Sequence, residues 1–267
     1  MQDNTGFDQI YKVSSSGGDE IALTSGSWDD CYPRWSPDGN WIAYIKDNIA
    51  GYRQVYKIPS LGGDEIAITS SSFTHGYEWD SPEWSWDSNC LTCSSYMAGY
   101  WRIMKIPADG SNESVLTSDC FPAGSVYPKW SPDGSLVAFH RGVDGYHQIF
   151  IVTTNGTANE TMLTTGVYTH WYPQWSPDGN WITYQRDTDT GWWQIFKVSI
   201  TTREEVQLTQ DECHHQHPQW SPDGNWIAYV KNDQTGCNQI YKIPADGGEQ
   251  VALTTLTLDH WYPQWSP

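Results

Sequence analysis

This chain of 267 residues has few basic residues, few cysteines and no long apolar run. It holds 14 Lys and Arg against 32 Asp and Glu, which gives a formal net charge of −18. Such a field repels phosphate backbones and anionic lipid headgroups, so a nucleic-acid partner is not expected. No stretch is long or apolar enough to span a bilayer, so we expect no membrane insertion. Cations, basic peptides and neutral ligands fit this charge better.

Cysteine is too sparse for a disulfide framework, because six residues are spread over the whole chain. Cys90 and Cys93 lie three positions apart on an expected strand, where their side chains point to opposite faces. This argues against a Cys-x-x-Cys redox or zinc site. One disulfide among the remaining cysteines is an open alternative.

The sequence also lacks common catalytic and targeting signatures. We find no Gly-x-Ser-x-Gly, no His-Glu-x-x-His, no Gly-rich phosphate loop and no dinucleotide fingerprint. The start, Met1-Gln2-Asp3-Asn4, does not resemble a signal peptide. The chain is therefore either cytoplasmic or without a leader that its precursor has.

What the sequence does contain is a repeat. A Trp-Ser pair, mostly followed by Pro-Asp-Gly, recurs at intervals of 49, 46, 45, 45 and 45 residues, with its Trp at Trp35, Trp84, Trp130, Trp175, Trp220 and Trp265. Self-similarity at this period is typical of propellers and solenoids, in which one supersecondary unit is copied.

One copy shows what the unit is. After the Pro177–Asn180 turn, short runs rich in β-branched and aromatic residues follow at 181–185, 194–198 and 206–209, and a first strand precedes the turn. Four short antiparallel strands in 45 residues predict one propeller blade. No segment has helical periodicity, so we expect an all-β, six-bladed β-propeller of four-stranded blades forming a single domain over 1–267.

The ends of the chain break the pattern. Five full blades are expected from about 32 to 254, and a composite closing blade from 7–24 plus 262–267. The second strand occurs only five times, and its copies begin at Trp41, Cys90, Leu136, Trp181 and Trp226. The closing blade therefore lacks this strand. Three alternatives remain open: a fragment of a longer array, a ring closed by a three-stranded blade, or closure through another molecule. An unpaired edge would favour self-association.

The repeated Pro-x-Trp-Ser-Pro-Asp-Gly turn with its following apolar strand resembles the TolB-type propeller repeat over nearly the whole chain. The second blade departs, since it reads Trp84-Ser85-Trp86-Asp87-Ser88-Asn89. The resemblance implies a binding platform, as in the periplasmic TolB protein, or a gating domain attached to a peptidase. It also implies a periplasmic or extracellular location. Some TolB-like propellers are lyases that act on acidic sugars through a metal held by His at the channel.

The repeated turn itself is expected to be structural. Asp38, Asp133, Asp178 and Asp223 each stand between Pro and Gly, where an Asp side chain bonds the backbone of its own turn.

The face of the propeller opposite the repeated turns is the better place for a binding site. Strand alternation puts the connections from each fourth strand to the next first strand together at the channel mouth, and these loops are variable and rich in aromatics and His. Three residues before the repeat Pro, the six copies read Asp30, Trp79, Ser125, His170, His215 and His260. His170, His215 and His260 could bind a divalent metal or form a pH-responsive patch, or they could simply pack locally. His217 adds a donor nearby.

Aromatic side chains suggest a second ligand chemistry on the same face. The loops of this face contain Trp28, Trp79, Trp171 and Trp261, which lie close in sequence to Asp residues such as Asp29, Asp80 and Asp259. Flat rings beside carboxylates are suited to stacking on sugars. We therefore favour a non-catalytic scaffold for a protein, peptide or glycan, without a cofactor. The alternatives are a lectin-like propeller and a metal-dependent, polysaccharide lyase-like enzyme that uses the three His.

Overall fold

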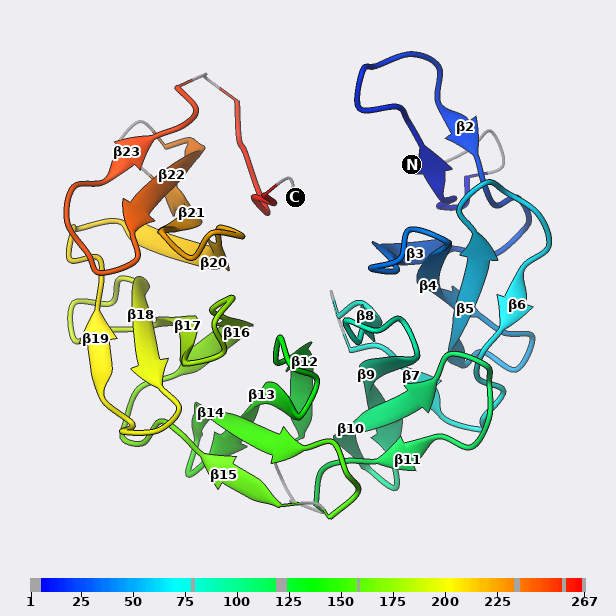
Figure 1. Cartoon of the computed structure of the whole chain (residues 1–267), viewed down its shortest axis with the longest axis horizontal. Coiled ribbons are helices and arrows are strands. Elements are labelled where there is room, and N and C mark those ends of the chain that lie inside the picture. Colours follow the sequence, from blue (N-terminus) through cyan, green and yellow to red (C-terminus); the bar gives the residue numbers. More distant parts are fainter. Residues whose placement is uncertain are drawn as a thin grey trace. The chain divides into compact units, whose positions relative to one another are not determined.

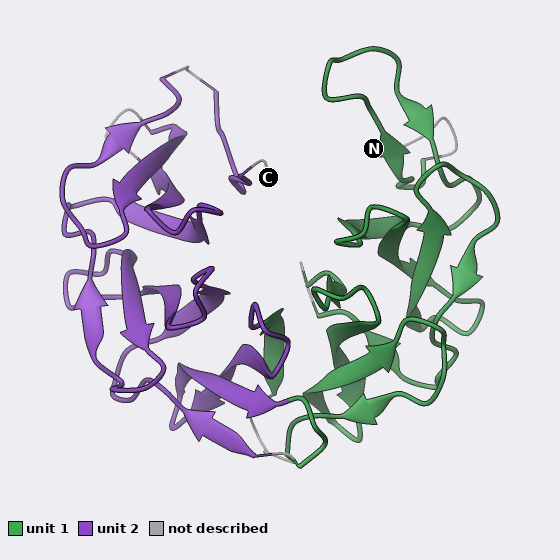
Figure 2. Ribbon diagram, viewed as in Figure 1, with its two compact units in different colours: residues 1–130, 154–158 green, residues 131–153, 159–267 purple. Residues whose placement is uncertain are grey.

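The computed structural model describes residues 6–77, 80–118, 124–157, 159–232, 236–255 and 258–265. These residues form short antiparallel strands, and no helix occurs in the described ranges. The chain divides into two compact units: unit 1 comprises residues 1–130 and 154–158, and unit 2 comprises residues 131–153 and 159–267 (Figure 2). No helix among the described residues is long and apolar enough to cross a bilayer. The all-β prediction is confirmed.

Unit 1 contains a two-stranded pair, a sheet in the order β3-β4-β5-β6, and a sheet in the order β11-β10-β9-β7 in which β8 also pairs with β9. Its strands are β1 (Tyr11–Lys12), β2 (Ile21–Ala22), β3 (Asp30–Trp35), β4 (Trp41–Asp47), β5 (Arg53–Pro59), β6 (Ile66–Ala67), β7 (Thr74–His75), β8 (Glu83–Trp84), β9 (Cys90–Met97), β10 (Tyr100–Pro107), β11 (Ser114–Val115) and β12 (Ser125–Trp130).

Unit 2 contains the consecutive antiparallel strands β13, β14 and β15, followed by two four-stranded sheets in the orders β16-β17-β18-β19 and β20-β21-β22-β23 (Figure 1). Its strands are β13 (Leu136–Val143), β14 (Tyr146–Thr153), β15 (Glu160–Met162), β16 (His170–Trp175), β17 (Trp181–Arg186), β18 (Gln194–Ser199), β19 (Glu205–Gln207), β20 (His214–Trp220), β21 (Trp226–Asn232), β22 (Asn238–Pro244) and β23 (Val251–Ala252).

Each second strand is buried on both faces, as its continuous apolar pattern predicts. In β17 the four residues from Ile182 to Gln185 are all buried. Its two neighbours lie on either side, with Gln185 opposite Trp171 of β16 and Ile195 of β18. Adjacent sheets then share a core: Ile149 of β14 packs in one cluster with residues of the next sheet, namely Trp175, Ile182, Tyr184, Phe196 and Val198.

A buried Gln–Thr clamp ties the third strand to the end of the fourth. In β18, Gln194 Oε1 accepts a hydrogen bond from Thr209 Oγ1 at 2.7 Å, while Thr209 Oγ1 accepts one from the Ile195 N–H at 2.9 Å. Gln194 Nε2 donates to the carbonyl oxygens of Asp211 and Cys213. The clamp thus fixes the loop that leads into the next first strand. It recurs as the pairs Gln9–Thr24, Gln54–Thr69, Gln148–Thr164 and Gln239–Thr254.

The repeated turn is held by its own aspartate, and the structural prediction for these residues is confirmed. Asp223 accepts hydrogen bonds from Ser221 Oγ at 2.5 Å and from the Asn225 backbone N–H at 3.0 Å. The bond from Ser221 is the main reason that the Asp223 carboxyl has a pKa below its usual value. The same bonds form at Asp38, Asp133 and Asp178, and also at Asp87 in the copy that lacks Pro-Asp-Gly.

Candidate functional site

The residue that opens each first strand lies against the second strand of its own sheet. In unit 1, Asp30 is opposite Lys46. In unit 2, His170 is opposite Arg186, and His215 is opposite Lys231. The side chains of Asp30, His170 and His215 are buried, at 2%, 0% and 0% exposure. A carboxylate or imidazole at this position therefore meets a cation on the neighbouring strand.

His170 is enclosed by polar groups of the same unit. Its Nδ1 lies 3.0 Å from the His147 carbonyl oxygen, and its Nε2 lies 3.9 Å from Glu205. Glu205 in turn accepts hydrogen bonds from Tyr184 at 2.7 Å and Arg186 at 3.1 Å. Burial lowers the pKa of His170, which favours the neutral ring, while the His147 carbonyl and Glu205 oppose this shift.

His215 has the same kind of surroundings one sheet further on. Its Nδ1 lies 3.1 Å from the Cys213 carbonyl oxygen, and its Nε2 lies 3.6 Å from Asp211. Asp211 pairs with Lys231 and accepts a hydrogen bond from Gln250 at 2.9 Å. Burial, with the Lys231 charge, lowers the pKa of His215 to about 4.

Asp30 is the counterpart in unit 1. Its carboxylate lies 3.3 Å from Lys46 Nζ, which also binds Glu65 at 2.7 Å. Burial raises the pKa of Asp30, and the Lys46 charge opposes that shift. The repeated arrangement is a buried polar group, a cation on the second strand and an acid or amide near the fourth.

His75 occupies this position in the sheet of β7–β11, where the sequence pattern placed Trp79. His75 is opposite Ser95, and Ser95 stands five residues after Cys90 as Lys46 stands five after Trp41. The first strand is interrupted between β7 and β8, so His75 precedes Trp84 by nine positions instead of five. Trp79 itself lies outside the described residues. A spacing of 49 residues instead of 45 was the available signal for this insertion.

The His residues do not come together as metal ligands. His170 and His215 each face into their own sheet, and His260, which is partly buried, donates its backbone N–H to the Asn238 carbonyl at 2.8 Å. Across the described parts of the chain, no group of three or more His, Cys, Asp or Glu side chains is placed to hold a metal ion.

Aromatic side chains do come together, in a row on the first strands of unit 2 and the segment after β23. We call Trp171, Tyr172, His217, Trp261 and Tyr262 the aromatic row. The His217 ring centroid lies 4.8 Å from Tyr172 and 4.6 Å from Tyr262, with Trp261 at 6.3 Å. Trp171 adjoins Tyr172 at 5.9 Å. Trp261 and Tyr262 are 47% and 58% exposed, so the row has an open end.

Backbone geometry directs these rings. Tyr172, His217 and Tyr262 have φ values of 58°, 55° and 52°. The register between β16 and β17 shifts at Tyr172, and that between β20 and β21 shifts at His217. Such bulges re-aim side chains, and a left-handed φ is unfavourable for a residue with a Cβ. At Tyr172, His217 and Tyr262 an aromatic ring is thus presented from a strained backbone conformation.

Of the residues proposed from sequence, the structure places His217 next to Trp261, and Trp171 joins them only through Tyr172. The Trp171 ring also packs against His140 and His147, at 4.7 and 4.6 Å. The structure places Asp30, His170 and His215 in the sheet interior instead. Tyr172 and Tyr262 were missed, although each follows a His-Trp pair in the repeat. Burial lowers the pKa of His217 to about 4, so this ring acts as a neutral aromatic.

The sequence of strand groups, β1–β2, β3–β6, β7–β11, β12–β15, β16–β19 and β20–β23, defines a six-bladed β-propeller, as predicted. Residues 173–267 match the family model of the TolB beta propeller domain. The resemblance expected from the repeated turn is thus found over residues 173–267. No curated protein sequence matches it.

Solved structures with the same fold include proteins of different activity. A structure assigned as TolB from Agrobacterium tumefaciens is 22% identical, with a TM-score of 0.70 over 88% of this chain and 84% of that one. An oligogalacturonate lyase in complex with manganese is 18% identical, with a TM-score of 0.72 over 91% and 69%. A puromycin hydrolase is 16% identical, with a TM-score of 0.76 over 98% and 45%. Similarity at these identities concerns the fold alone.

Proposed function

We propose that this chain is a non-catalytic binding scaffold whose ligand is a basic peptide segment lying on the aromatic row. The observation that supports this most is the set of five adjoining rings with Trp261 and Tyr262 about half exposed. Trp and Tyr supply large rigid contact areas and are enriched among the residues that dominate binding energy.

Charge favours a basic partner. The net charge is −18, and the exposed Asp259 stands two residues before Trp261. Asp187 and Asp189 lie in the β17–β18 connection, where Asp187 accepts a hydrogen bond from the Thr169 N–H and Asp189 one from the Tyr168 hydroxyl. A cationic side chain above an aromatic ring gains cation–π attraction, and the acidic surroundings accelerate its association.

The enzyme alternative finds less support. A lyase-like reaction would require His170, His215 and His260 to share a divalent metal. In the described residues, His170 and His215 instead contact separate acids, Glu205 and Asp211. The chemistry available at the aromatic row is stacking and hydrogen bonding, without a nucleophile and base in mutual contact.

A peptide array of basic, acidic and neutral sequences, followed by titration of the best binders, tests the proposal. We expect basic peptides to bind, and Trp261→Ala to weaken binding by at least ~10-fold. Trp86→Ala is the matched control, because Trp86 is 63% exposed but lies in a turn of unit 1. Binding that is equal in both variants, or a preference for acidic peptides, would contradict the proposal. Binding of neutral glycans alone through Trp261 would favour the lectin-like alternative.

A further inference from the structure

The two-stranded sheet of unit 1 has an open edge at β1. This strand pairs with β2 on one side, and no other strand in the described part of the chain pairs with it. The Leu23 N–H donates to the Ile10 carbonyl, so Ile10 and Lys12 direct their backbone groups toward β2, and by alternation Tyr11 and Val13 direct theirs to the open side. An unpaired row of N–H and C=O groups is a template for a further strand.

Val13 shows which cover the open edge lacks. It stands four residues after Gln9 of the Gln–Thr clamp and is 58% exposed. In the β3–β6 sheet its counterpart Ile58 lies opposite Ile42 of the second strand. An apolar residue of an added strand would cover Val13 in the same way. The residues at this position of the other third strands are all 0% exposed, namely Ile58, Ile106, Val152, Val198 and Ile243.

Tyr11 indicates that the added strand carries an aromatic residue. Its counterparts on the other third strands each stack with an aromatic ring of the second strand. The pairs are Tyr44–Tyr56 at 6.0 Å, Phe139–Phe150 at 5.5 Å, Tyr184–Phe196 at 6.1 Å and Tyr229–Tyr241 at 6.3 Å between ring centroids. Cross-strand aromatic pairs of this kind stabilise a sheet. A Tyr or Phe opposite Tyr11 completes the pattern.

Glu20 indicates a cation two residues after that aromatic. Glu20 stands four residues before the clamp residue Thr24 and is exposed, and it has no ion pair with any of the described residues. In four other sheets the residue at this position binds the Lys or Arg of the second strand. These pairs are Glu65–Lys46 at 2.7 Å, Glu160–Arg141 at 2.7 Å, Glu205–Arg186 at 3.1 Å and Gln250–Lys231 at 3.2 Å.

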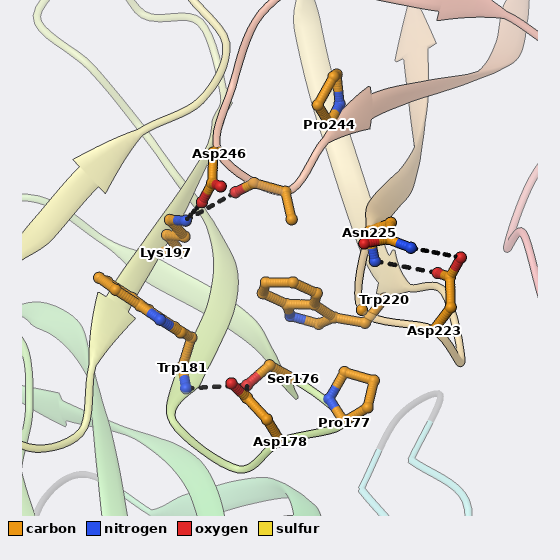
Figure 3. Close-up of a pocket in the computed structure, with 12 residues that line it drawn as sticks. Ser176, Pro177, Asp178, Trp181, Lys197, Trp220, Asp223, Asn225, Pro244 and Asp246 are labelled. Carbon is orange, nitrogen blue, oxygen red and sulfur yellow. Dashed lines mark hydrogen bonds and ion pairs between the residues drawn. The ribbon is translucent and has the colours of Figure 1, made fainter.

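Lys12 adds a place for an indole at the start of the added strand. Its counterpart Lys197 donates to the Ala245 carbonyl at 2.7 Å, and the Lys197 Nζ lies 4.6 Å from the ring of Trp181, the first residue of β17 (Figure 3). Lys12 makes the same kind of bond, to the Ser60 carbonyl at 2.7 Å. A Trp beside Lys12 gains cation–π attraction.

We propose that β1 binds an extended segment of a partner polypeptide, which pairs antiparallel with it and has the pattern Trp-apolar-x-Tyr-apolar-Lys, with Phe or Arg as substitutes for Tyr or Lys. Main-chain hydrogen bonds to Tyr11 and Val13 supply affinity, and the side chains around Glu20 and Lys12 supply specificity. A second copy of this chain is not the partner, because its strands of this type, such as β4, β9, β17 and β21, are paired on both sides. The surface shares no residue with the aromatic row and goes beyond the function proposed above.

The probe is a synthetic peptide with the sequence of residues 225–232, which reads Asn-Trp-Ile-Ala-Tyr-Val-Lys-Asn. It is titrated into the whole chain by calorimetry, and amide hydrogen exchange is followed by NMR. We expect saturable binding, with slower exchange at the Tyr11 and Val13 N–H groups. A Tyr229→Ala peptide should bind ~10-fold more weakly or worse. A Lys231→Gln peptide should bind about fivefold more weakly, because it loses its ion pair with Glu20.

Variants of the chain locate the peptide on β1. Val13→Asp places an unpaired charge under the added strand and should weaken binding by ~10-fold or more. Val13 is exposed in the free chain, so this variant should fold as the parent does. Glu20→Lys should bind a Lys231→Glu peptide more tightly than the original peptide. Asp19→Lys is the matched control, since it makes the same charge change at the neighbouring exposed residue and should not reverse the preference.

The proposal is overturned if the peptide does not bind, or if Val13→Asp and Glu20→Lys bind it as the parent does. Bound peptide that leaves exchange at Tyr11 and Val13 unchanged also overturns it. A dimer of the chain alone that dissociates in Val13→Asp would identify a second copy as the occupant and contradict the proposal. Trp261→Ala should bind this peptide as the parent does, whereas a loss there would assign the peptide to the aromatic row.

Discussion

His215 lies with its Nε2 3.6 Å from the Asp211 carboxylate, which also binds Lys231, so the imidazole is packed between an acid and a cation. His75 is enclosed in a similar way, with Ser71 and Ser95 oxygens each 2.7 Å from a ring nitrogen and Glu113 at 3.6 Å. Burial lowers the pKa of both His75 and His215 to about 4, and Lys231 adds to the shift at His215. These rings are held neutral by the folded state.

Stability should therefore fall as the solution is acidified. The folded pKa of about 4 is below the ordinary value of 6.5. Between pH 6.5 and pH 4 the unfolded chain thus binds more protons than the folded chain. The stability that the neutral rings contribute is complete above pH 6.5 and is lost toward pH 4. We expect the free energy of unfolding to fall by about 2 kcal/mol for each His when the pH is lowered from 7 to 5. Urea denaturation at these pH values measures the loss.

The variant His215→Gln isolates one of the two groups. It should flatten the pH dependence, because glutamine does not titrate. Asp80 is the opposing group: burial raises its pKa to about 6, which favours folding as the pH falls. An unchanged slope in His215→Gln would contradict the assignment of the loss to His215.

Removing the hydroxyl of Thr209 should destabilise the fold. In Thr209→Val the shape is kept, but Gln194 Oε1 loses its donor and the Ile195 N–H loses its acceptor. Leaving buried polar groups unpaired predicts a loss of about 2–3 kcal/mol in the free energy of unfolding. Thr201→Val, at an exposed turn position, is the control and should change it by less than about 0.5 kcal/mol. Equal effects in the two variants would refute the role of the clamp.

The repeat predicts the architecture well because turns and strands are local. The Asp223 turn and the doubly buried strand β17 both follow from residue types within one copy. The interpretation of His170 and His215 as ligands at an open mouth had no such support. The register shifts that follow these residues, between Trp171 and Gln174 and between Gln216 and Gln219, interrupt the simple alternation of side chains on which that interpretation relied.

The interrupted first strand of the β7–β11 sheet shows the same limit. Counting three residues back from the repeat Pro gives Trp79 as the counterpart of His170 and His215. The strand pairing gives His75 instead. Only the excess length between copies hints at an insertion, and it does not say where the extra residues go. Trp220 Nε1, which has no acceptor in the part of the chain that the structure describes, also has no sequence signal, since Trp220 matches its counterparts in residue type.

The buried pair of Arg141 and Glu160 offers a further test of the sheet interior. Two hydrogen bonds of 2.7 and 2.9 Å join the guanidinium to the carboxylate, and the Arg141 side chain is 4% exposed. Arg141→Met should cost about 3–5 kcal/mol because it removes both charged hydrogen bonds that the guanidinium makes to the Glu160 carboxylate. The double variant with Glu160→Gln should recover part of that loss. Thermal unfolding of the four proteins in the cycle measures the coupling, and additive losses would show that the pair is not coupled.

Binding at the aromatic row should be independent of pH in the range where an ordinary histidine titrates. Burial lowers the pKa of His217 to about 4. The ring is then neutral at pH 6 and at pH 8, and it packs in tilted contact with Tyr172 and Tyr262. We expect the dissociation constant of a basic peptide to change less than about twofold between these pH values. His217→Phe should keep most of the affinity, whereas His217→Ala should lose it. A strong pH dependence that disappears in His217→Phe would mean that a protonated or metal-binding imidazole, and not an aromatic surface, recognises the ligand.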